Sequence, residues 1–458
     1  MSASYRLERA WVAGAVHDDV LVEIEDGRFT RVELRGRVMN LVGKTSGANP
    51  RVPRSGGEMV TLPGLTLPGL ANTHSHAFHR ALRGRTQRGR GTFWTWREQM
   101  YAVAERLDPD SYFRLARAIY REMVVAGMTS VGEFHYLHHQ PDGTPYADPH
   151  AMSHALVEAA AQAGIRLTLL DTCYLSSGFG EPPQGVQRRF SDGDVDAWAT
   201  RAGSFQPAAG TALTGAAIHS VRAVPAEAMP TVADLATGRP LHVHVSEQVA
   251  ENSACVAAYA RTPVEVLLDH GVLGPLTTAV HATHLTEDDV AHLADTATYA
   301  GFCPTTERDL GDGIGPGRRL REAGVRVTLG SDSHAVVDPF EEMRALELDE
   351  RLATQQRGHW TAADLLEAGT RHGQTSLGWD DAGEIAVGRR ADLVTLDTAS
   401  PRTAGTGADA HTAVFAATAA DVTQVVVDGR VVVRQGDAVK TRGEIGRELD
   451  ATIRGLWR

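Results

Sequence analysis

Two hydrophobic patterns divide the chain. Up to residue 65, short stretches of alternating apolar and polar residues are separated by glycine-containing turns, which predicts a small β unit. From Thr66 onward, β-branched apolar runs alternate with longer segments of helical periodicity, a pattern typical of a parallel sheet covered by helices. From Gly383 the short alternation returns. We therefore predict a β domain built from residues 1–65 and 383–458, the latter including the C-terminal tail, around a middle domain of residues 66–382.

The middle domain contains eight apolar runs of this kind. Eight strands with intervening helices are the number that closes a (β/α)8 barrel. The predicted fold is therefore an α/β, TIM-like (β/α)8 barrel with a small β-sandwich domain built from both chain ends. The eight runs are Thr66–His76, Met128–Leu137, Arg166–Leu175, Ala212–Val221, Leu241–Glu247, Thr278–Leu285, Thr298–Thr305 and Val325–Ser331.

Local chemistry predicts two helix boundaries between these runs. Asp108 or Asp110 is placed to cap a helix that runs through Ala126 and ends before Gly127. The segment Thr262-Pro263-Val264-Glu265 has the residues of a capping box with proline in the first helical position.

Charge, length of apolar runs and cysteine content exclude several classes of protein. The 458 residues carry a formal net charge of -12, which argues against nucleic acid or an anionic membrane surface as a partner. No stretch approaches the roughly 20 apolar residues of a membrane span. The three cysteines are far apart and form no Cys-x-x-Cys pair, which predicts a reduced, cytoplasmic protein.

Lysine is rare and histidine is abundant. Lys44 and Lys440 are the lysines of the chain, and both lie outside the predicted barrel. This position excludes a barrel lysine as a Schiff base, as a phosphate-binding Walker residue or as a carboxylated bridge between two metal ions. The 20 histidines direct attention to metal or acid–base chemistry instead.

Candidate metal ligands lie at the ends of the predicted strands, where barrel enzymes carry their catalytic groups. The first run ends in His74 and His76, whose imidazoles share one face because two positions separate them. The fifth run contains His244, and Asp332 directly follows the eighth. Three imidazoles and one carboxylate suit zinc or a similar divalent ion. We predict one such ion per chain. Cys173 and Glu133 are the alternative bridging ligands if two ions bind.

Four motifs around these positions resemble a known family. They are His74-Ser-His-Ala-Phe-His-Arg-Ala-Leu-Arg-Gly, Phe93-Trp-Thr-Trp-Arg-Glu-Gln-Met-Tyr, Glu133-Phe-His-Tyr-Leu-His-His and Gly330-Ser-Asp-Ser-His. With His244, Glu247, His281 and the segment Gly383–Leu393, they resemble the amidohydrolase superfamily, in its branch of mononuclear metal aminohydrolases, over nearly the whole chain. Within that branch they are similar to the formimidoylglutamate deiminases, which act in histidine degradation. The resemblance implies a hydrolase that converts N-formimino-L-glutamate, a linear amidine, to N-formyl-L-glutamate and ammonia.

Three residues are predicted to be catalytic. A bound divalent ion lowers the pKa of its water towards 7. Glu247 is placed to move a proton from water to the leaving nitrogen, and Asp332 to act as ligand and base. His281 is placed to stabilise the attacking oxygen. Two alternatives stay open: Glu247 caps the following helix, or His284 replaces His281, since only one of these two histidines can point inward from a strand.

Substrate contacts follow from the resemblance alone. It assigns Arg97, Tyr136 and Arg222 to the carboxylates of an acidic, amino-acid-derived substrate, and His219 to its formimino end. His79 departs from the family, in which a glutamine that contacts the formimino group is frequent. The resemblance also implies a homodimer. The other histidines near the strand ends are interpreted as supporting or loop residues: His135, His138, His139 and His334.

Two other functions compete with this one. Another deaminase of the same branch, acting on a purine, pyrimidine or guanidine-type substrate, would need a largely uncharged pocket, and Arg97 and Arg222 argue against it. A binding protein on the same scaffold should have lost metal ligands, and the sequence retains all of those predicted.

Overall fold

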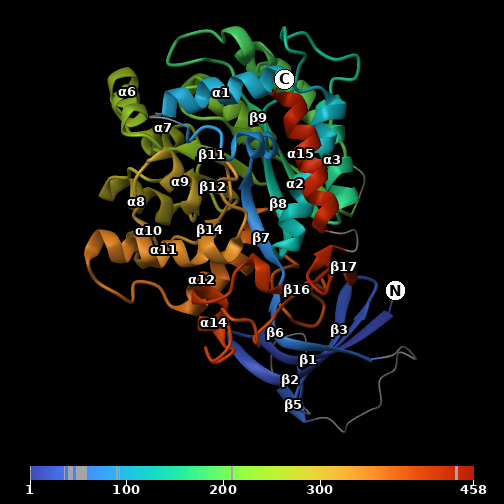
Figure 1. Cartoon of the computed structure of the whole chain (residues 1–458). Coiled ribbons are helices and arrows are strands. Elements are labelled where there is room, and N and C mark those ends of the chain that lie inside the picture. Colours follow the sequence, from blue (N-terminus) through green and yellow to red (C-terminus); the bar gives the residue numbers. More distant parts are fainter. Residues whose placement is uncertain are drawn as a thin grey trace.

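The computed structural model describes residues 2–35, 37–39, 45–47, 59–88, 91, 93–207, 210–438 and 442–457. Lys44 and Lys440 lie outside the described residues. Figure 1 shows a barrel with a second sheet beneath it, and both ends of the chain contribute strands to that second sheet.

Eight strands form the barrel, and each is parallel to the next. A parallel bridge between Ser75 and Asp332 joins the region after the last strand to the first strand. At this seam the amide of Asp332 donates to the carbonyl of His74 over 3.0 Å. The predicted barrel is confirmed, and each predicted run overlaps one barrel strand. The strands are β7 (Leu70–Ser75), β8 (Met128–His135), β9 (Arg166–Cys173), β10 (Ala212–Ile218), β11 (Leu241–Val245), β12 (Thr277–His281), β13 (Tyr299–Phe302) and β14 (Val327–Leu329).

The first run, Thr66–His76, contains parts of two strands where one was predicted. β6 (Met59–Pro68) belongs to the second sheet, and the barrel strand β7 begins two residues later, at Leu70. Gly69 lies at the change of sheet, where an added Cβ would stand 2.3 Å from Oγ1 of Thr129. The residues on both sides of Gly69 are buried, so the hydrophobic pattern shows no break between the strands.

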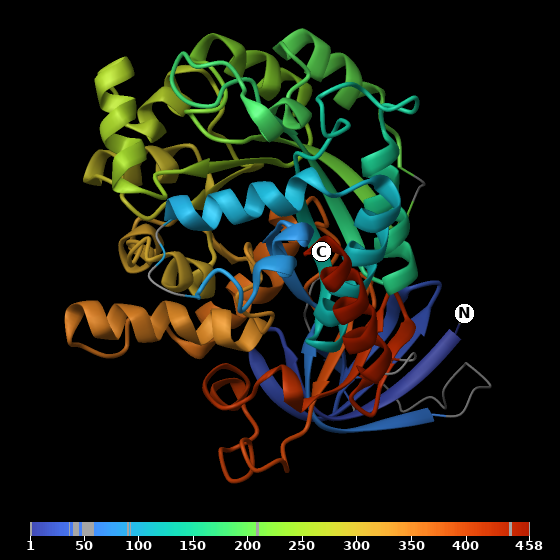
Figure 2. The same ribbon diagram turned by 45° about the horizontal axis from the view of Figure 1, so that its top comes forward.

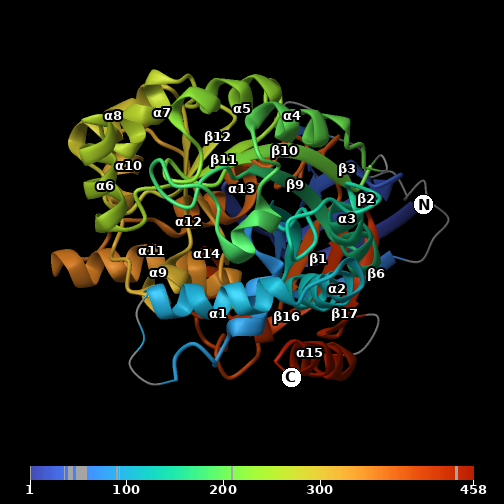
Figure 3. The ribbon, with the colours of Figure 1, turned by 90° about the horizontal axis from the view of Figure 1, so that it is seen from above.

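Helices surround the barrel, as Figure 3 shows from above. The side chain of Asp108 caps α2 by accepting a hydrogen bond from the amide of Ser111, and Gly127 follows the helix with φ +99°. Thr262 begins the predicted capping box of α7, with Pro263 in its first turn. Both boundaries predicted from local chemistry are therefore confirmed.

The helical segments vary widely in length. The described part of the chain contains no helix that is long and apolar enough to cross a membrane. The α-helices are α1 (Phe93–Glu105), α2 (Pro109–Val125), α3 (Ala151–Ala163), α4 (Val195–Ser204), α5 (Met229–Leu235), α6 (Val249–Tyr259), α7 (Pro263–Asp269), α8 (Glu287–Asp295), α9 (Pro304–Leu310), α10 (Gly317–Glu322), α11 (Pro339–Thr354), α12 (Ala362–Glu367), α13 (Gly373–Ser376), α14 (Ala410–Phe415) and α15 (Arg442–Leu456). Shorter segments are η1 (Ala77–Leu82), η2 (Gly185–Phe190), η3 (Ala226–Ala228), η4 (Ala368–His372) and η5 (Ala419–Asp421).

The second sheet joins the two ends of the chain. Its strand order is β18-β17-β16-β15-β6-β1-β2-β3-β4-β5, and β15 pairs directly with β6. Leu7 and Phe29 from the N-terminal part share one buried core with Leu393 and Val426 from the C-terminal part. The remaining strands are β1 (Ser2–Val12), β2 (Ala15–Glu25), β3 (Arg28–Leu34), β4 (Arg37–Met39), β5 (Thr45–Gly47), β15 (Leu393–Leu396), β16 (Val422–Val427), β17 (Arg430–Arg434) and β18 (Asp437–Ala438).

A buried ion pair fixes this sheet to the N-terminal end of the barrel. Nη1 of Arg166, at the start of β9, donates to Oδ1 of Asp392 over 2.9 Å. Each of these side chains is 1% exposed, and Arg166 also contacts Asp428 at 3.1 Å. Removal of one partner would leave an unpaired buried charge, so the pair specifies how the two parts fit together.

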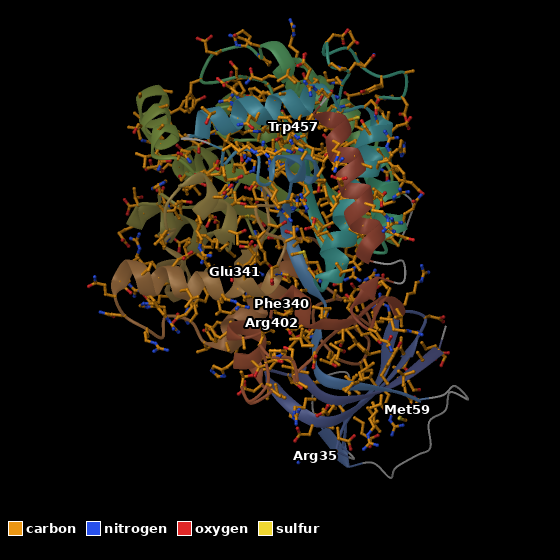
Figure 4. The ribbon with its side chains drawn as sticks, in the orientation of Figure 1. Arg35, Met59, Phe340, Glu341, Arg402 and Trp457 are labelled. Carbon is orange, nitrogen blue, oxygen red and sulfur yellow. The ribbon has the colours of Figure 1, made fainter. Side chains whose placement is uncertain are left out.

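The C-terminal helix α15 packs on the barrel. Glu448 accepts hydrogen bonds from Arg117 and Arg121 of α2, at 2.7 and 2.8 Å. Just after the helix, the indole of Trp457 donates to the carbonyl of Ala81 over 3.0 Å. Figure 4 labels Trp457 at this end of the helix, far from the second sheet. The last described residues therefore support the wall of the barrel.

Candidate metal centre and active-site pocket

Three imidazoles and one carboxylate converge where the barrel strands end. His74 belongs to β7, His76 directly follows that strand, His244 belongs to β11, and Asp332 follows β14. Nε2 of His244 lies 3.0 Å from Nε2 of His74 and 3.3 Å from Nε2 of His76. Oδ1 of Asp332 lies 3.3 Å from Nε2 of both His74 and His76. The four residues predicted as metal ligands thus meet around one point.

Backbone carbonyls orient two of these imidazoles. Nδ1 of His76 donates to the carbonyl of Phe134 over 3.0 Å, and Nδ1 of His244 donates to the carbonyl of His219 over 2.9 Å. A proton on Nδ1 leaves the lone pair of Nε2 for a metal. Burial lowers the pKa of His74, His76 and His244 below the usual value, which keeps them neutral.

The spacing and chemistry of these atoms fit a metal ion. Ligands at ~2.0–2.1 Å from a tetrahedral ion lie roughly 3.3 Å from one another. The four separations given above, two between imidazoles and two between Asp332 and an imidazole, are 3.0–3.3 Å. Burial alone would raise the pKa of Asp332, but the hydrogen bond with His74 and the nearby imidazoles hold it below the usual range, so Asp332 is a carboxylate. Three neutral imidazoles and one carboxylate suit a borderline divalent cation.

The backbone around this cluster is strained. Ser246, His281 and Asp332 have φ values of +53°, +67° and +37°, a region that residues with a side chain rarely occupy. Such strain persists only where the surrounding structure holds it, and it is common at active sites. The barrel seam supplies that constraint at Asp332, whose amide and carbonyl both bond to β7 and its extension.

A second polar group lies beside the imidazole cluster. Nε2 of His281 is 3.8 Å from Oε1 of Glu247 and 3.9 Å from Oδ2 of Asp332. Its Nδ1 is 3.4 Å from Oε1 of Glu307. Burial raises the pKa of Glu247 to about 7. Burial lowers the pKa of His281, but Glu247, Glu307 and Asp332 outweigh it and raise the value to about 10. Near neutral pH, Glu247 can therefore take up or release a proton, whereas His281 holds one.

The positions of the side chains distinguish the alternatives that the sequence left open. His281 lines the pocket, whereas Nε2 of His284 donates to the carbonyl of Asp312 over 2.8 Å. Gln248 is the N-cap residue of α6, and no side chain caps that helix. Glu247 lies in the pocket beside His281.

One pocket connects this cluster to the arginines that the family resemblance singled out. Arg97 belongs to α1, which crosses in front of the barrel strands in Figure 2. Arg222 lies after β10, and Tyr136 after β8. Every predicted site residue except His74 lines this pocket. These residues are His76, His79, Arg97, Tyr136, His219, Arg222, His244, Glu247, His281 and Asp332.

Neighbouring side chains hold the two arginines. Nε of Arg97 donates to the hydroxyl of Tyr101 over 2.6 Å, and the guanidinium lies 5.2 Å from the centre of that ring. Nε of Arg222 lies 3.5 Å from Oε1 of Glu251, a buried carboxyl group of α6. The pocket therefore carries positive charge from two separate elements.

His79 is a neutral hydrogen-bonding group of the pocket. Its Nε2 lies 3.0 Å from the hydroxyl of Tyr136. Burial lowers the pKa of His79 to about 3. Its Nδ1 is buried, and this ring nitrogen of His79 has no hydrogen-bond partner among the described residues.

The remaining histidines near the strand ends do not line the pocket. Nε2 of His139 lies 3.0 Å from Oδ1 of Asp192, and Nε2 of His334 lies 3.1 Å from Oγ of Ser75. Within the described residues, the pocket lining includes none of His135, His138, His139 and His334.

The alternative bridging ligands are also placed elsewhere. The two carboxylate oxygens of Glu133 accept hydrogen bonds from the amide of Ala77 at 2.6 Å and from Oγ of Ser75 at 2.7 Å. Cys173 is fully buried and is not among the described residues that line the pocket.

Sequence reasoning missed several residues that support the pocket. Tyr101 lies four positions after Arg97 in the quoted motif, so helical spacing alone would have paired them. Gln187, Glu251 and Glu307 gave no such signal, because their partners lie far away in the sequence.

Comparisons with known proteins give the family and the fold. A model of the amidohydrolase family matches residues 65–432. A formimidoylglutamate deiminase of Pseudomonas aeruginosa is 40% identical over 394 residues, which cover 82% of this chain and 86% of that protein. A 5'-deoxyadenosine deaminase of Methanothermobacter thermautotrophicus is 29% identical over 386 residues, or 81% and 83% of the two chains. The crystal structure of an amidohydrolase from Brucella melitensis superposes with a TM-score of 0.86 at 32% identity and covers 100% of both chains.

Proposed function

The chain belongs to the amidohydrolase family, and from that premise we propose that it hydrolyses N-formimino-L-glutamate to N-formyl-L-glutamate and ammonia, a reaction of histidine degradation. One observation supports this substrate above all: a single pocket has metal-type ligands at one end and Arg97 and Arg222 on its lining. An amidine with two carboxylates matches both features, because arginine binds carboxylates through paired hydrogen bonds.

Different residues of the chain have different roles in the reaction. His74, His76, His244 and Asp332 would hold one zinc ion, which would lower the pKa of a bound water and supply a nucleophile near neutral pH. Glu247 takes a proton from the attacking water and delivers it to the nitrogen that leaves as ammonia. His281 donates a hydrogen bond to the attacking oxygen, and the Glu307 carboxylate orients its ring.

Recognition of the substrate uses the other end of the pocket. Arg97, Tyr136 and Arg222 bind the carboxylates and so place the amidine carbon near the imidazole cluster. His79 and His219 contact the formimino group. Because His79 is neutral, its ring can either donate to or accept from that group.

Further properties belong to the same proposal. The protein acts as a homodimer in the cytoplasm with one divalent ion per chain, and residues 66–382 form the catalytic domain. Its three cysteines, Cys173, Cys255 and Cys303, are buried and free, as a reducing compartment would leave them.

Assays with four candidate substrates test the proposal. We expect rapid ammonia release from N-formimino-L-glutamate, at most trace ammonia release from 5'-deoxyadenosine or guanine, and at most trace release of the amino acid from an N-acyl amino acid. The adenosine-type deaminases among the relatives and the aromatic groups Trp96, Tyr174 and Phe190 in the pocket make a base the main alternative. Faster turnover of a base than of N-formimino-L-glutamate would replace the proposed substrate.

A further inference from the structure

A buried glutamine joins two pocket tyrosines that sequence reasoning did not identify. Gln187, in η2, is 5% exposed. Its Nε2 donates to the hydroxyl of Tyr101 over 3.0 Å and to the hydroxyl of Tyr174 over 2.8 Å. Tyr101 comes from α1 and Tyr174 follows β9, so the amide links two walls of the pocket that both tyrosines line.

The orientation of the Gln187 amide is determined by its other end. Oε1 of Gln187 accepts a hydrogen bond from the backbone amide of Gln184 over 3.0 Å. A backbone N–H can only donate, so this atom must be the oxygen, and the NH₂ group must face the tyrosines. Each tyrosine hydroxyl is therefore an acceptor towards Gln187.

Because both hydroxyl oxygens accept hydrogen bonds from Gln187, the protons of the hydroxyls take no part in these hydrogen bonds. The Tyr101 oxygen also accepts from Nε of Arg97 at 2.6 Å, so two donors already occupy it. Within the described part of the chain, neither hydroxyl donates to an acceptor. Burial raises the pKa of the Tyr174 hydroxyl above its usual range, which keeps the proton in place. Each hydroxyl thus has one hydrogen bond left to donate, in a pocket that also contains Arg97 and Arg222.

We propose that Tyr101 and Tyr174 are two further carboxylate donors of the substrate site, and that Gln187 is the positioning residue that makes both hydroxyls donate into the pocket. This inference rests on the proposed function, because it requires an anionic substrate. A carboxylate only accepts hydrogen bonds, so it complements hydroxyls that have no remaining role except to donate. A neutral base with its own donors would gain less from them.

Removal of the hydroxyls is the direct test. In Tyr101→Phe and Tyr174→Phe the rings remain, so we expect full metal content and an unchanged melting temperature. A hydrogen bond to a charged group is worth ~1.5–3 kcal/mol, so kcat/KM for N-formimino-L-glutamate should fall about 10- to 100-fold in each variant, mainly through KM. The dissociation constant of the product, N-formyl-L-glutamate, measured by calorimetry, should rise to a similar extent.

Tyr299→Phe is the matched control. This buried residue also loses a hydroxyl hydrogen bond, to Thr375 at 3.1 Å, but it belongs to β13 and is not among the described residues that line the pocket. We expect its kcat/KM to equal that of the wild type. Equal KM and product affinity in the wild type and both pocket Phe variants would overturn the inference, whereas an inactive wild type would overturn the proposed function.

The role of Gln187 is tested by reversal of its hydrogen bonds. In Gln187→Glu the carboxylate would accept from both hydroxyls and take their protons from the pocket, so kcat/KM should fall at least as far as in the double Phe variant. The added charge could also repel the substrate directly. A double-mutant cycle separates these causes. Gln187→Glu should have little further effect in the Tyr101→Phe/Tyr174→Phe background, and an undiminished effect there would contradict the positioning role.

Discussion

Two groups of residues that line the pocket are held in different ways. In the first group, called the metal-ligand end, His244 comes from a barrel strand and His76 directly follows one, and backbone carbonyls fix their rings. In the second group, called the arginine end, Arg97 and Arg222 come from α1 and from the segment after β10, and side chains hold them. The side chain of His76 is 3% exposed, whereas that of Arg222 is 23% exposed.

We infer that this difference separates the residues of the chemical step from the residues that determine substrate specificity. The carbonyls that orient the imidazoles belong to the barrel backbone, so no single substitution removes them without loss of the fold. The arginines depend on Tyr101 and Glu251, which can change without disturbing the strands. We infer that relatives with other substrates keep the first end and alter the second.

The largest effect should follow the loss of a ligand at the metal end. In His244→Ala the bound metal should fall far below one equivalent per chain, and turnover should fall roughly 10⁴-fold or more, because the reaction then depends on unactivated water. Metal analysis and ammonia release measure the two quantities. The exposed His154→Ala should change neither. Full activity in His244→Ala would show that the imidazole cluster is not the metal site.

Glu247→Gln should come next, since it removes a proton carrier and leaves the ligands intact. We expect turnover to fall ~10²–10⁴-fold with the metal still bound. Glu227→Gln, an exposed residue of η3, is the control and should behave as the wild type. Nearly normal turnover in Glu247→Gln would show that Glu247 does not transfer the proton. The metal ligands alone would then account for the chemistry.

Arg222→Met tests the arginine end of the pocket. Loss of one partner of a desolvated ion pair costs roughly 2–5 kcal/mol, so kcat/KM for N-formimino-L-glutamate should fall about 30-fold to several thousand-fold, with the metal retained. The control is Arg188→Met, an exposed residue of η2. Should both variants deiminate N-formimino-L-glutamate and its glycine analogue as the wild type does, Arg222 would not bind a carboxylate.

The smallest predicted effect is a pH dependence. Burial raises the pKa of Glu247 to about 7, and a bound dication would lower it because it favours the carboxylate. Only the deprotonated form accepts a proton, so kcat/KM should fall about tenfold per pH unit below a midpoint at or under pH 7. Metal content measured at each pH separates this effect from loss of the metal. A midpoint above pH 7, or a profile that stays flat down to the lowest pH at which the metal is retained, would contradict it.

The sequence by itself determined the barrel and the metal-ligand end. Alternation along a strand places His74 and His76 on one face, and the strands of a barrel bring their ends together, so His244 and Asp332 could be added without a structure. Helix starts at Asp108 and Thr262 were also predictable, because a cap depends on residues within one helical turn.

Only the tertiary structure decided how the arginine end is held and how the second sheet is attached to the barrel. Gln187 bonds to Tyr101 across 86 positions of sequence, and Arg166 bonds to Asp392 across 226. No periodicity connects such residues, since loops and domain junctions lack the repeat that strands and helices impose. The change of sheet at Gly69 was not predicted for a related reason. Both strands are buried, and a uniform apolar run does not show which strand each of them pairs with.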